Sequence, residues 1–512
     1  MGGPTLAEGM GTGGYVWATW LFLRALGLTY LIAFISYAVQ VKGLIGHNGI
    51  LPAREFVDGQ AKRLGPSRFW VLPTLCWFSQ RDRFLQWLCW GGALVSIAQF
   101  IGLAQPIVLV LLWVFYLSLF NVSRVFLGYQ WDVLLLEIGF LAIFAAPLEL
   151  LPHWPSAHEL HWSIRWLLWL LLFRLMFLSG FVKLRSGDHS WRDLTALTFH
   201  YETQPLPTRA AWYIQQLPVW FHKLSTLVMY AIELALPFAI FIPGSYCRPI
   251  ASLAFIGFMI LIMITGNYGF FNLATIALCL LLFDDSIFVR FFGAATPQPD
   301  SLPAILPSVG VVVLILLLLL SANLLFRITG INHRCLNPLT KFCGWFDRFR
   351  ILNSYGLFSV MTPKRLEILI EGSDDGREWR LYHFRYKPGD LDQPPRRVAP
   401  HQPRLDWQMW FAAFSDYRYN PWFIALMIRL LEGRPEVLAL LEENPFTARP
   451  PRFIRAVLYE FHFTDWATRR RTGYWWRREK KWFYCPVLSL KGEERQLMAA
   501  DELNGPEGTE GT

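Results

Sequence analysis

The sequence predicts a polytopic α-helical membrane protein with about eight or nine transmembrane helices and a C-terminal soluble α+β domain rich in β-strands. Hydrophobic residues make up 54% of the 512 residues and charged residues only 17%, against about 25% charged in an average soluble domain. The charge deficit lies in residues 16–326, where long apolar runs recur. Residues 327–490 have the polar composition of an ordinary globular domain.

The predicted membrane spans are apolar runs close to the length of about 20 residues that crosses a bilayer. The run at 303–326, with VVVLILLLLL at its centre, is the plainest of them. A turn is expected at Gly266–Gly269, between the seventh and eighth spans. The nine runs are 17–38, 84–104, 105–121, 133–152, 164–183, 224–243, 250–266, 268–289 and 303–326. The fourth begins at Trp131–Asp132 and is either a full span or a re-entrant segment.

The helical transmembrane domain at 16–326 contains two hydrophilic loops, at 40–83 and 184–223. Residues 1–15 are rich in glycine and lack the basic region of a signal peptide, so we expect a disordered N-terminus followed by a retained span. The acidic tail at 491–512 is also expected to be disordered.

Four charged residues lie well inside the predicted spans: Arg24, Glu137, Arg174 and Glu233. A charge at the bilayer centre costs about 2.5–3.5 kcal/mol on insertion scales, so such residues usually face the bundle and pair. We therefore expect Glu137 or Glu233 to pair with Arg174 or Arg24. Salt bridges that fix helix order are the first interpretation, and a polar cavity for a substrate group is the second.

The C-terminal domain combines strand and helix patterns. In residues 366–371 apolar side chains alternate with Glu367 and Glu371, which predicts a strand with one buried face. The other predicted elements are a hairpin turn at 373–376, a return strand at 379–386, a helix at 417–443 broken at Pro435, a strand at 459–463, and at 474–484 either a strand pair or an interfacial segment.

The net charge of +9 comes from the C-terminal domain, since residues 327–490 hold 27 Lys and Arg against 17 Asp and Glu. Such a domain suits anionic headgroups or an acidic partner. We expect no nucleic-acid partner, because the basic residues are scattered among aromatics and no nucleic-acid-binding motif is present. No phosphate-loop, nucleophile-elbow, zinc-protease or dinucleotide motif occurs, and no cofactor or metal is expected.

Lys183 lies at the end of the apolar run FLSGFV. The preferred interpretation is an interfacial anchor whose ammonium reaches the headgroups. The alternative is a partly desolvated lysine that acts as a base.

Long motifs rich in Trp, His and Pro run through the chain, and over residues 15–490 they resemble the lipase maturation factor family. The motifs are GLIGHNGILP at 43–52, GYQWDVLLLEIGFLAIFAAP at 128–147, FRLMFLSGFVKLRSGDHSWRDLTALTFHYETQPLP at 173–207, PVWFHKLS at 218–225, NSYGLFSVMT at 353–362, HQPRLDWQMWFAAF at 401–414, NPW at 420–422 and NPFTARPPRFIRAVLYEFHF at 444–463.

The resemblance implies a membrane-embedded maturation factor that assists folding or assembly of client lipases or related secreted proteins, rather than an enzyme. No catalytic residue is therefore carried over. The residues that match the family's signature, expected to bind the client, are Trp191, Arg192, Asp193, His200, Tyr201, Glu202, Thr203, Gln204, Pro205, Trp220, Phe221, His222, Arg404, Asp406, Trp407, Trp410 and Phe411. Trp475 and Trp476 are expected to join Trp407 and Trp410 in contacting the client.

The implied location is the endoplasmic reticulum membrane in a eukaryote and the cytoplasmic (inner) membrane in a bacterium. With nine spans the loop at 184–223 and the C-terminal domain share one face of the membrane, where their aromatic side chains should pack together. Counting Lys and Arg places that face in the cytoplasm, whereas the resemblance places it in the lumen. We adopt the lumen, because long loops follow the charge rule poorly.

The membrane half is also faintly similar to the transmembrane domain of vitamin K-dependent carboxylase-like proteins, in which a Gly-x-x-Lys-type segment is followed by Asp and Trp. Here GFVK at 180–183 is followed by Asp188 and Trp191. The alternative function is thus a membrane enzyme with Lys183 as base on a lipid-like substrate. It requires a polar pocket around Lys183, roofed by 184–223, with His200 or His222 within hydrogen-bond reach. We expect that arrangement to be absent.

Overall fold

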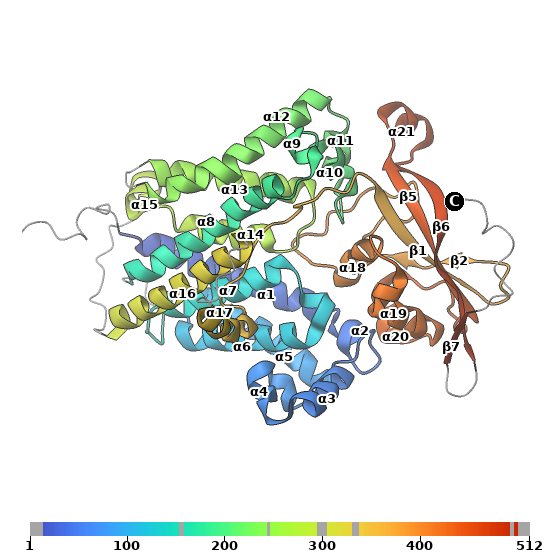
Figure 1. The fold of residues 1–512 in the computed structure, drawn as a ribbon, viewed down its shortest axis with the longest axis horizontal. Coiled ribbons are helices and arrows are strands. Elements are labelled where there is room, and N and C mark those ends of the chain that lie inside the picture. Colours follow the sequence, from blue (N-terminus) through green and yellow to red (C-terminus); the bar gives the residue numbers. More distant parts are fainter. Residues whose placement is uncertain are drawn as a thin grey trace, which may run out of the picture.

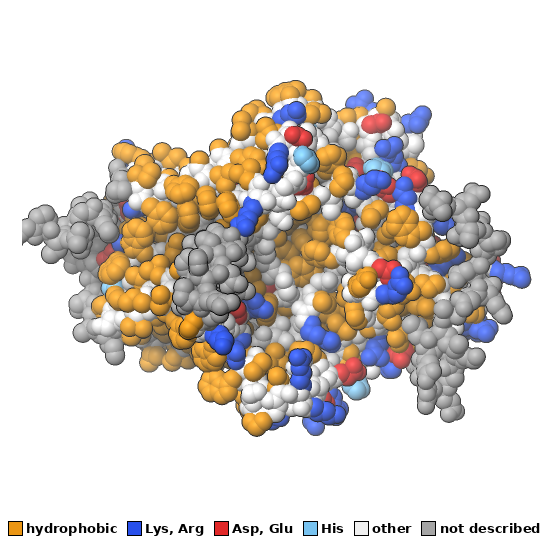
Figure 2. Space-filling view, viewed as in Figure 1, with side chains coloured by type: hydrophobic (Ala, Val, Ile, Leu, Met, Phe, Trp, Pro, Cys, Tyr) orange, Lys and Arg blue, Asp and Glu red, His pale blue; other side chains and the backbone are white. Residues whose placement is uncertain are grey.

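The computed structural model describes residues 14–152, 158–242, 246–293, 305–329, 337–491 and 496–499. The helices of the first two thirds of the chain form one bundle, and the C-terminal sheet lies across one end of it (Figure 1). Hydrophobic side chains cover the bundle, while charged side chains are more frequent over the sheet end and over the lower helices α3 and α4 (Figure 2).

The bundle is formed by long helices joined by short ones. The long helices and the broken segments that continue them are α1 (Val16–Ala38), α5 (Asp82–Ile101), α6 (Gln105–Ser123), η3 (Arg124–Leu127), α7 (Gln130–Ala145), α8 (Trp162–Arg185), α12 (Val219–Tyr230), the π-helix η4 (Ala231–Ala235), η5 (Leu236–Phe241), α13 (Cys247–Thr265), α14 (Phe271–Leu280), α15 (Asp285–Phe292) and α16 (Ile305–Thr329).

Within the described residues, seven helices are long and apolar enough to cross a membrane, and α14 with α15 makes an eighth if that bent pair is one span. The protein is therefore a multi-pass membrane protein. The seven are Val16–Ala38, Asp82–Ile101, Gln105–Leu127, Trp162–Arg185, Val219–Phe241, Cys247–Thr265 and Pro307–Leu324.

Two of the nine predicted spans differ from a simple crossing. The run at 133–152 forms α7, which has only 16 residues and ends at Ala145, so it is shorter than the length of about 20 residues needed to span. Most of its residues are buried against other helices. The run at 268–289 bends by 91° between α14 and α15, where the Asp284 side chain accepts a hydrogen bond from Ser286 N and caps α15. The expected turn at 266–269 is present between α13 and α14.

Both hydrophilic loops are largely helical. The loop at 40–83 contains α2 (Val41–Ile45), α3 (Ala53–Leu64), η1 (Gly65–Ser67), α4 (Arg68–Val71) and η2 (Leu75–Trp77). The loop at 184–223, called the signature loop below, contains α9 (His189–Arg192), α10 (Leu197–Thr203), α11 (Arg209–Gln215) and the start of α12.

The C-terminal domain has a five-stranded antiparallel sheet in the order β2-β1-β5-β6-β7 and a two-stranded sheet β3-β4. Its helices α18 to α20 lie between the sheet and the bundle (Figure 1). The elements are α17 (Asn337–Phe346), η7 (Asp347–Phe349), β1 (Arg365–Ser373), β2 (Arg380–Leu381), β3 (His383–Phe384), α18 (Arg404–Ala412), η8 (Tyr417–Tyr419), α19 (Pro421–Leu431), α20 (Pro435–Leu438), β4 (Leu441–Glu443), β5 (Phe453–Phe463), α21 (Trp466–Thr472), β6 (Trp476–Lys491) and β7 (Gln496–Ala499).

The expected strand at 366–371 is β1. Residues on both of its faces are buried, whereas the sequence predicted one buried face. Glu367 is 1% exposed, and it forms ion pairs with Arg365 at 2.6 Å and Lys387 at 3.0 Å. The alternation rule failed here because two buried cations provide the acid with partners. The segment 474–484 contributes to the single long strand β6, and the return strand is divided into β2 and β3.

The chain ends are only partly described. Tyr15, which we expected in a disordered terminus, is buried and its ring lies 5.7 Å from that of Trp169. In the acidic tail, Gln496–Ala499 form β7 against β6. Of these two segments, residues 1–13, 492–495 and 500–512 lie outside the described residues.

A buried ion pair joins the C-terminal domain to the bundle. Arg404, the first residue of α18, donates from Nη1 and Nη2 to the two carboxylate oxygens of Asp132 on α7, at 2.6 and 2.8 Å. Both side chains are 0% exposed, and the Tyr116 hydroxyl donates to the same carboxylate at 2.6 Å. Since removing two charges from water is costly, such a pair is tolerated only when its hydrogen bonds are nearly all made.

A second buried acid on α7 binds the segment that leads into β1. Glu137 forms an ion pair with Arg174 of α8, which confirms the pairing expected from the sequence. The same carboxylate accepts hydrogen bonds from Asn353 N at 2.9 Å and from the Tyr355 hydroxyl at 2.7 Å. Helix α7 therefore holds the C-terminal domain at two points.

We predict that Arg404→Met destabilises the folded protein by about 3–5 kcal/mol, because it leaves Asp132 as an unpaired buried charge. The double variant Asp132→Leu/Arg404→Met should lose less, because neither charge remains. Equilibrium unfolding in mixed detergent micelles measures both. The control is Arg418→Ala, which breaks an exposed pair with Asp416 and should leave the unfolding midpoint unchanged. A double variant as unstable as Arg404→Met would contradict the prediction.

Candidate functional site

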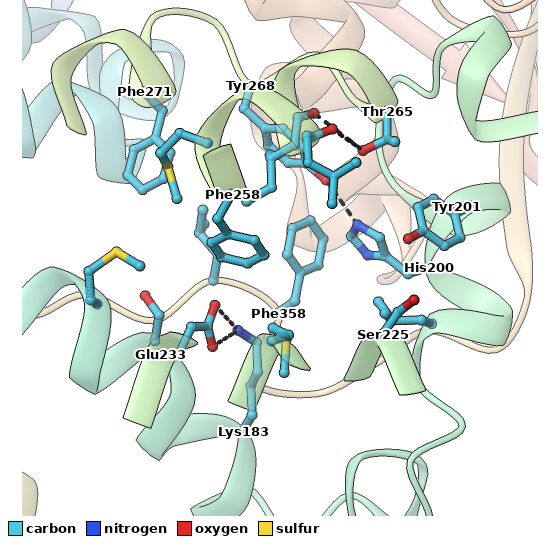
Figure 3. A pocket seen from close by; sticks show the side chains of 18 of the residues that line it. Lys183, His200, Tyr201, Ser225, Glu233, Phe258, Thr265, Tyr268, Phe271 and Phe358 are labelled. Carbon is cyan, nitrogen blue, oxygen red and sulfur yellow. Dashed lines mark hydrogen bonds and ion pairs between the residues drawn. The ribbon is translucent and has the colours of Figure 1, made fainter. Parts of the chain in front are cut away.

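An apolar cavity of about 180 Å³ lies inside the bundle, next to the signature loop. Figure 3 shows aromatic side chains, among them Phe258, Phe271 and Phe358, around its centre and polar groups at its two ends. Its wall comes from α8 to α12, η4, α13, the α13–α14 turn and α14, together with the segment 357–358 before β1. The cavity is thus bounded by both halves of the chain.

One polar end of the cavity is an ion pair between α8 and the π-helix η4. Lys183 Nζ lies 2.8 and 2.6 Å from the two carboxylate oxygens of Glu233, and both side chains are 7% exposed. The Trp191 ring lies 5.4 Å from the ammonium. These contacts neutralise the lysine charge within an apolar wall.

Two local sequence features bring Lys183 and Glu233 together. A Cβ at Gly180 would lie 2.8 Å from Leu234 and 3.0 Å from the Glu233 Cβ, so only glycine lets α8 approach η4 this closely. Pro237 follows Glu233 by four residues, and in a regular helix its ring would clash with the Glu233 carbonyl. The chain instead widens into the π-helix at 231–235, a feature often found at functional sites.

The other polar end of the cavity is formed by the signature loop and the α13–α14 turn. The Tyr268 hydroxyl donates to Gln204 Oε1 at 2.9 Å and lies 3.4 Å from His200 Nε2. Burial, and then the nearby Lys183 charge, lower the pKa of His200 to about 4. His200 is therefore a neutral imidazole at physiological pH. Figure 3 shows the Tyr201 and Ser225 side chains on the same side as His200.

Lys183 does not have the interfacial position that we preferred from the sequence, because it is only 6% exposed and paired with Glu233. A pocket beside the signature loop surrounds it. The arrangement that we expected to be absent required a polar pocket with His200 or His222 within hydrogen-bond reach of the lysine. The pocket is mainly apolar, however, and in the described chain the lysine hydrogen-bonds to Glu233 rather than to His200 or His222. Figure 3 shows this pair apart from His200.

Arg24, the last of the four intramembrane charges named from the sequence, donates to Gln105 at 3.3 Å and lies over the Trp20 ring at 5.1 Å. In the described part of the chain, no group of three or more His, Cys, Asp or Glu side chains is placed to hold a metal ion.

The signature loop is hydrogen-bonded to the C-terminal sheet. Arg365 of β1, which is 0% exposed, donates to the main-chain oxygens of Glu202, Gln204 and Pro205. The Glu202 carboxylate accepts from Phe463 N at 2.7 Å, next to His462.

Helix α18 adds a further contact to the loop. Trp410 Nε1 donates to the Thr203 carbonyl at 2.9 Å. The signature segment 202–205 thus joins the two halves of the protein.

The signature residues divide by exposure. The buried ones line the cavity or join the bundle to the C-terminal domain, and only four are exposed on the surface. Buried are Trp191, Tyr201, Thr203, Gln204, Pro205, His222, Arg404, Asp406, Trp407 and Trp410; His200, Glu202 and Phe221 are half-buried; Arg192, Asp193, Trp220 and Phe411 are exposed.

The tryptophans that we expected to contact a client are mostly interior. Trp407 and Trp410 are buried under the sheet, and Trp475 and Trp476 pack around Trp212 of the signature loop. Asp406 accepts from the main-chain nitrogens of Tyr386 and Lys387. Sequence composition alone could not distinguish tryptophans that complete a core from those on a surface.

Exposed aromatic and basic side chains are instead frequent along residues 466–482, called the 466–482 surface below. Its aromatic members are Trp466, Tyr474 and Trp482, at 46%, 43% and 59% exposure. Tyr213 of the signature loop lies 5.5 Å from Trp466. The exposed basic members are Arg470, Arg471, Arg477, Arg478 and Lys480.

Comparisons with known proteins agree over nearly the whole chain. Residues 17–290 match the family model described as the lipase maturation factor transmembrane domain, and residues 351–486 match the lipase maturation factor C-terminal domain. No solved structure matches the chain.

The curated relatives are similar along most of their own length. Lipase maturation factor 2 of Homo sapiens is 36% identical over 92% of this chain and 82% of the relative. Lipase maturation factor 2 of Gallus gallus is 35% identical over 92% and 81%. Lipase maturation factor 1 of Homo sapiens is 34% identical over 93% and 89%. The carboxylase-like alternative gains no support from these matches.

We predict that Glu233→Met destabilises the protein more than Lys183→Met/Glu233→Met, because the single variant leaves an unpaired ammonium in an apolar wall. The single change should cost about 3–5 kcal/mol. Unfolding in mixed micelles measures the difference, and Ser179→Ala on α8, the helix that carries Lys183, is the control. Equal unfolding free energies for the single and double variants would show that the unpaired Lys183 ammonium carries no such cost.

We predict that stability falls as the pH rises above about 6.5, through loss of the proton on His462. The hydrogen bond to Glu202 raises the pKa of His462, so the folded state binds the proton more tightly than the unfolded chain, whose histidine pKa is about 6.5. The stabilisation is complete below that value and is lost as the pH passes the raised pKa. Thermal melts across this range should show the slope in the native protein and a smaller slope in His462→Gln.

Glu202→Gln tests the same contact from the other side and should also reduce the slope. A His462→Gln variant that keeps the native pH dependence would show that another group is responsible.

Proposed function

The chain belongs to the lipase maturation factor family and acts as a maturation factor, and we propose that its client is a lipase captured on the 466–482 surface. The observation that carries this proposal is the concentration of exposed aromatic and basic side chains at the end of the molecule opposite most of the apolar bundle. Aromatic residues and arginine are enriched in the cores of protein interfaces, and lysine and acidic residues are depleted.

A surface of this composition suits an incompletely folded client. Trp466, Tyr474 and Trp482 provide apolar area for segments that a finished lipase would bury, while five nearby basic side chains attract acidic clients over a longer range. The surface is supported from behind by the buried Trp475 and Trp476. Support of this kind lets exposed aromatics bind without ordering their own backbone first.

The proposed location is a membrane of the secretory pathway, which in a eukaryotic cell is the endoplasmic reticulum membrane. The C-terminal domain and the signature loop would face the lumen, where a secreted lipase folds. Since Arg365, Glu202 and Arg404 bind the domain to the bundle, the client would be held at a fixed distance from the bilayer.

We predict that Trp466→Ala/Trp482→Ala lowers client capture at least tenfold, because truncating an aromatic hot spot costs about 2 kcal/mol or more. Co-purification with a secreted homodimeric lipase, and the activity of the secreted lipase per unit of lipase protein, measure the effect. The control is Tyr419→Ala, which removes an 81% exposed aromatic elsewhere in the domain.

Salt provides a second test of the same surface. Capture by the native protein should weaken as the ionic strength rises, and Arg470→Glu/Arg471→Glu should weaken it at low salt. Undiminished lipase maturation by both the aromatic and the charge variants would place client binding elsewhere.

A further inference from the structure

The cavity beside Lys183 has the walls of a lipid site. The residues that line it are mainly aliphatic, aromatic or sulfur-containing, including Met176, Met229, Phe258 and Phe271. Flexible thioether side chains adapt to irregular apolar ligands. An engineered apolar cavity of roughly 150 Å³ binds benzene, so the 180 Å³ here is large enough for a small head group and the first carbons of a chain.

One wall of the cavity faces the surface that would contact the bilayer. Leu261 of α13 lines the cavity and is 50% exposed. Its neighbours Ile260 and Ile264, and Leu224 and Leu227 on α12, are also exposed apolar residues. Because α12 and α13 belong to candidate membrane spans, this wall would face lipid in a bilayer.

The polar groups inside the cavity carry no net charge. Glu233 accepts two of the three protons of the Lys183 ammonium, which leaves a donor for a ligand oxygen. His200 is neutral, and Tyr268 is already bonded to Gln204. A ligand hydroxyl can both donate to the Glu233 carboxylate and accept from Lys183.

We propose that this cavity binds an uncharged amphipathic lipid, with its hydroxyl or ester head group at the Lys183–Glu233 pair and its acyl chain leaving past Leu261 between α12 and α13. A carboxylate or ammonium head group is disfavoured, because it would add an uncompensated charge to a site that is already neutral. The lipid site lies inside the bundle and is separate from the 466–482 surface, so it does not depend on the proposed client.

The test uses the full chain in phosphatidylcholine nanodiscs and a monoacylglycerol with a photoreactive diazirine in its acyl chain. Mass spectrometry after irradiation should find saturable labelling of cavity residues such as Met176, Met229 and Leu261, which unlabelled monoacylglycerol displaces. A diazirine fatty acid of the same length should label these residues at least tenfold less at neutral pH.

Met229→Trp fills the cavity and should reduce labelling at least tenfold. Leu253→Trp is the matched control, because Leu253 is 62% exposed on the same helix as Leu261 and does not line the cavity. Lys183→Met/Glu233→Met removes the polar end without adding charge and should abolish displacement by monoacylglycerol. This second variant keeps the test decisive if Met229→Trp fails to elute as a folded monodisperse protein.

Two results would overturn the proposal. Labelling that does not saturate and is unchanged in both variants would mean that the probe contacts only the outer surface. Equal labelling by the fatty acid would refute the uncharged head group.

Discussion

The fold depends most on the ion pair between Asp132 and Arg404. It joins a helix inside the bundle to the first residue of α18, and neither side chain reaches solvent. A buried pair of this kind adds little net stability over an apolar pair, but a structure that lacks one partner carries the full cost of a buried charge. The C-terminal domain therefore has one low-energy position on the bundle, and the contacts made by Glu137 with Asn353 and Tyr355 follow from that position.

The same rule governs the acids inside the bundle. Glu137 is paired with Arg174 and Glu233 with Lys183, and each pair joins two helical elements of the bundle. Apolar packing alone is weakly directional among lipid-facing helices, because hydrocarbon tails compete equally well for the same surfaces. Charged pairs can therefore specify which helices meet. The Lys183–Glu233 pair requires α8 and η4 to pack very closely, and Gly180 allows this.

Composition and periodicity predicted the membrane class, most helices and the principal strands, because burial of whole apolar faces depends on local pattern. They failed where a residue's partner is distant in the chain. Glu367 was assigned to an exposed face because one of its two partners, Lys387, lies outside its strand, and Lys183 was assigned to the interface because Glu233 follows it by fifty residues. Helix α7 was taken for a span because its run is apolar, although its burial comes from surrounding helices. The resemblance located the signature loop but could not tell which of its residues are interior.

The signature loop contacts the cavity and the sheet through consecutive residues, which connects the two proposed sites physically. His200 and Tyr201 line the cavity, while the next four residues receive hydrogen bonds from Arg365, Phe463 and Trp410. A ligand that moved α10 would therefore have to move β1, β5 and α18 or break those bonds. Such a ligand can shift the equilibrium between two positions of α10 only by the difference in its binding free energy for those positions. The dense hydrogen bonding of 202–205 therefore favours a ligand that fills the cavity while leaving the loop in place.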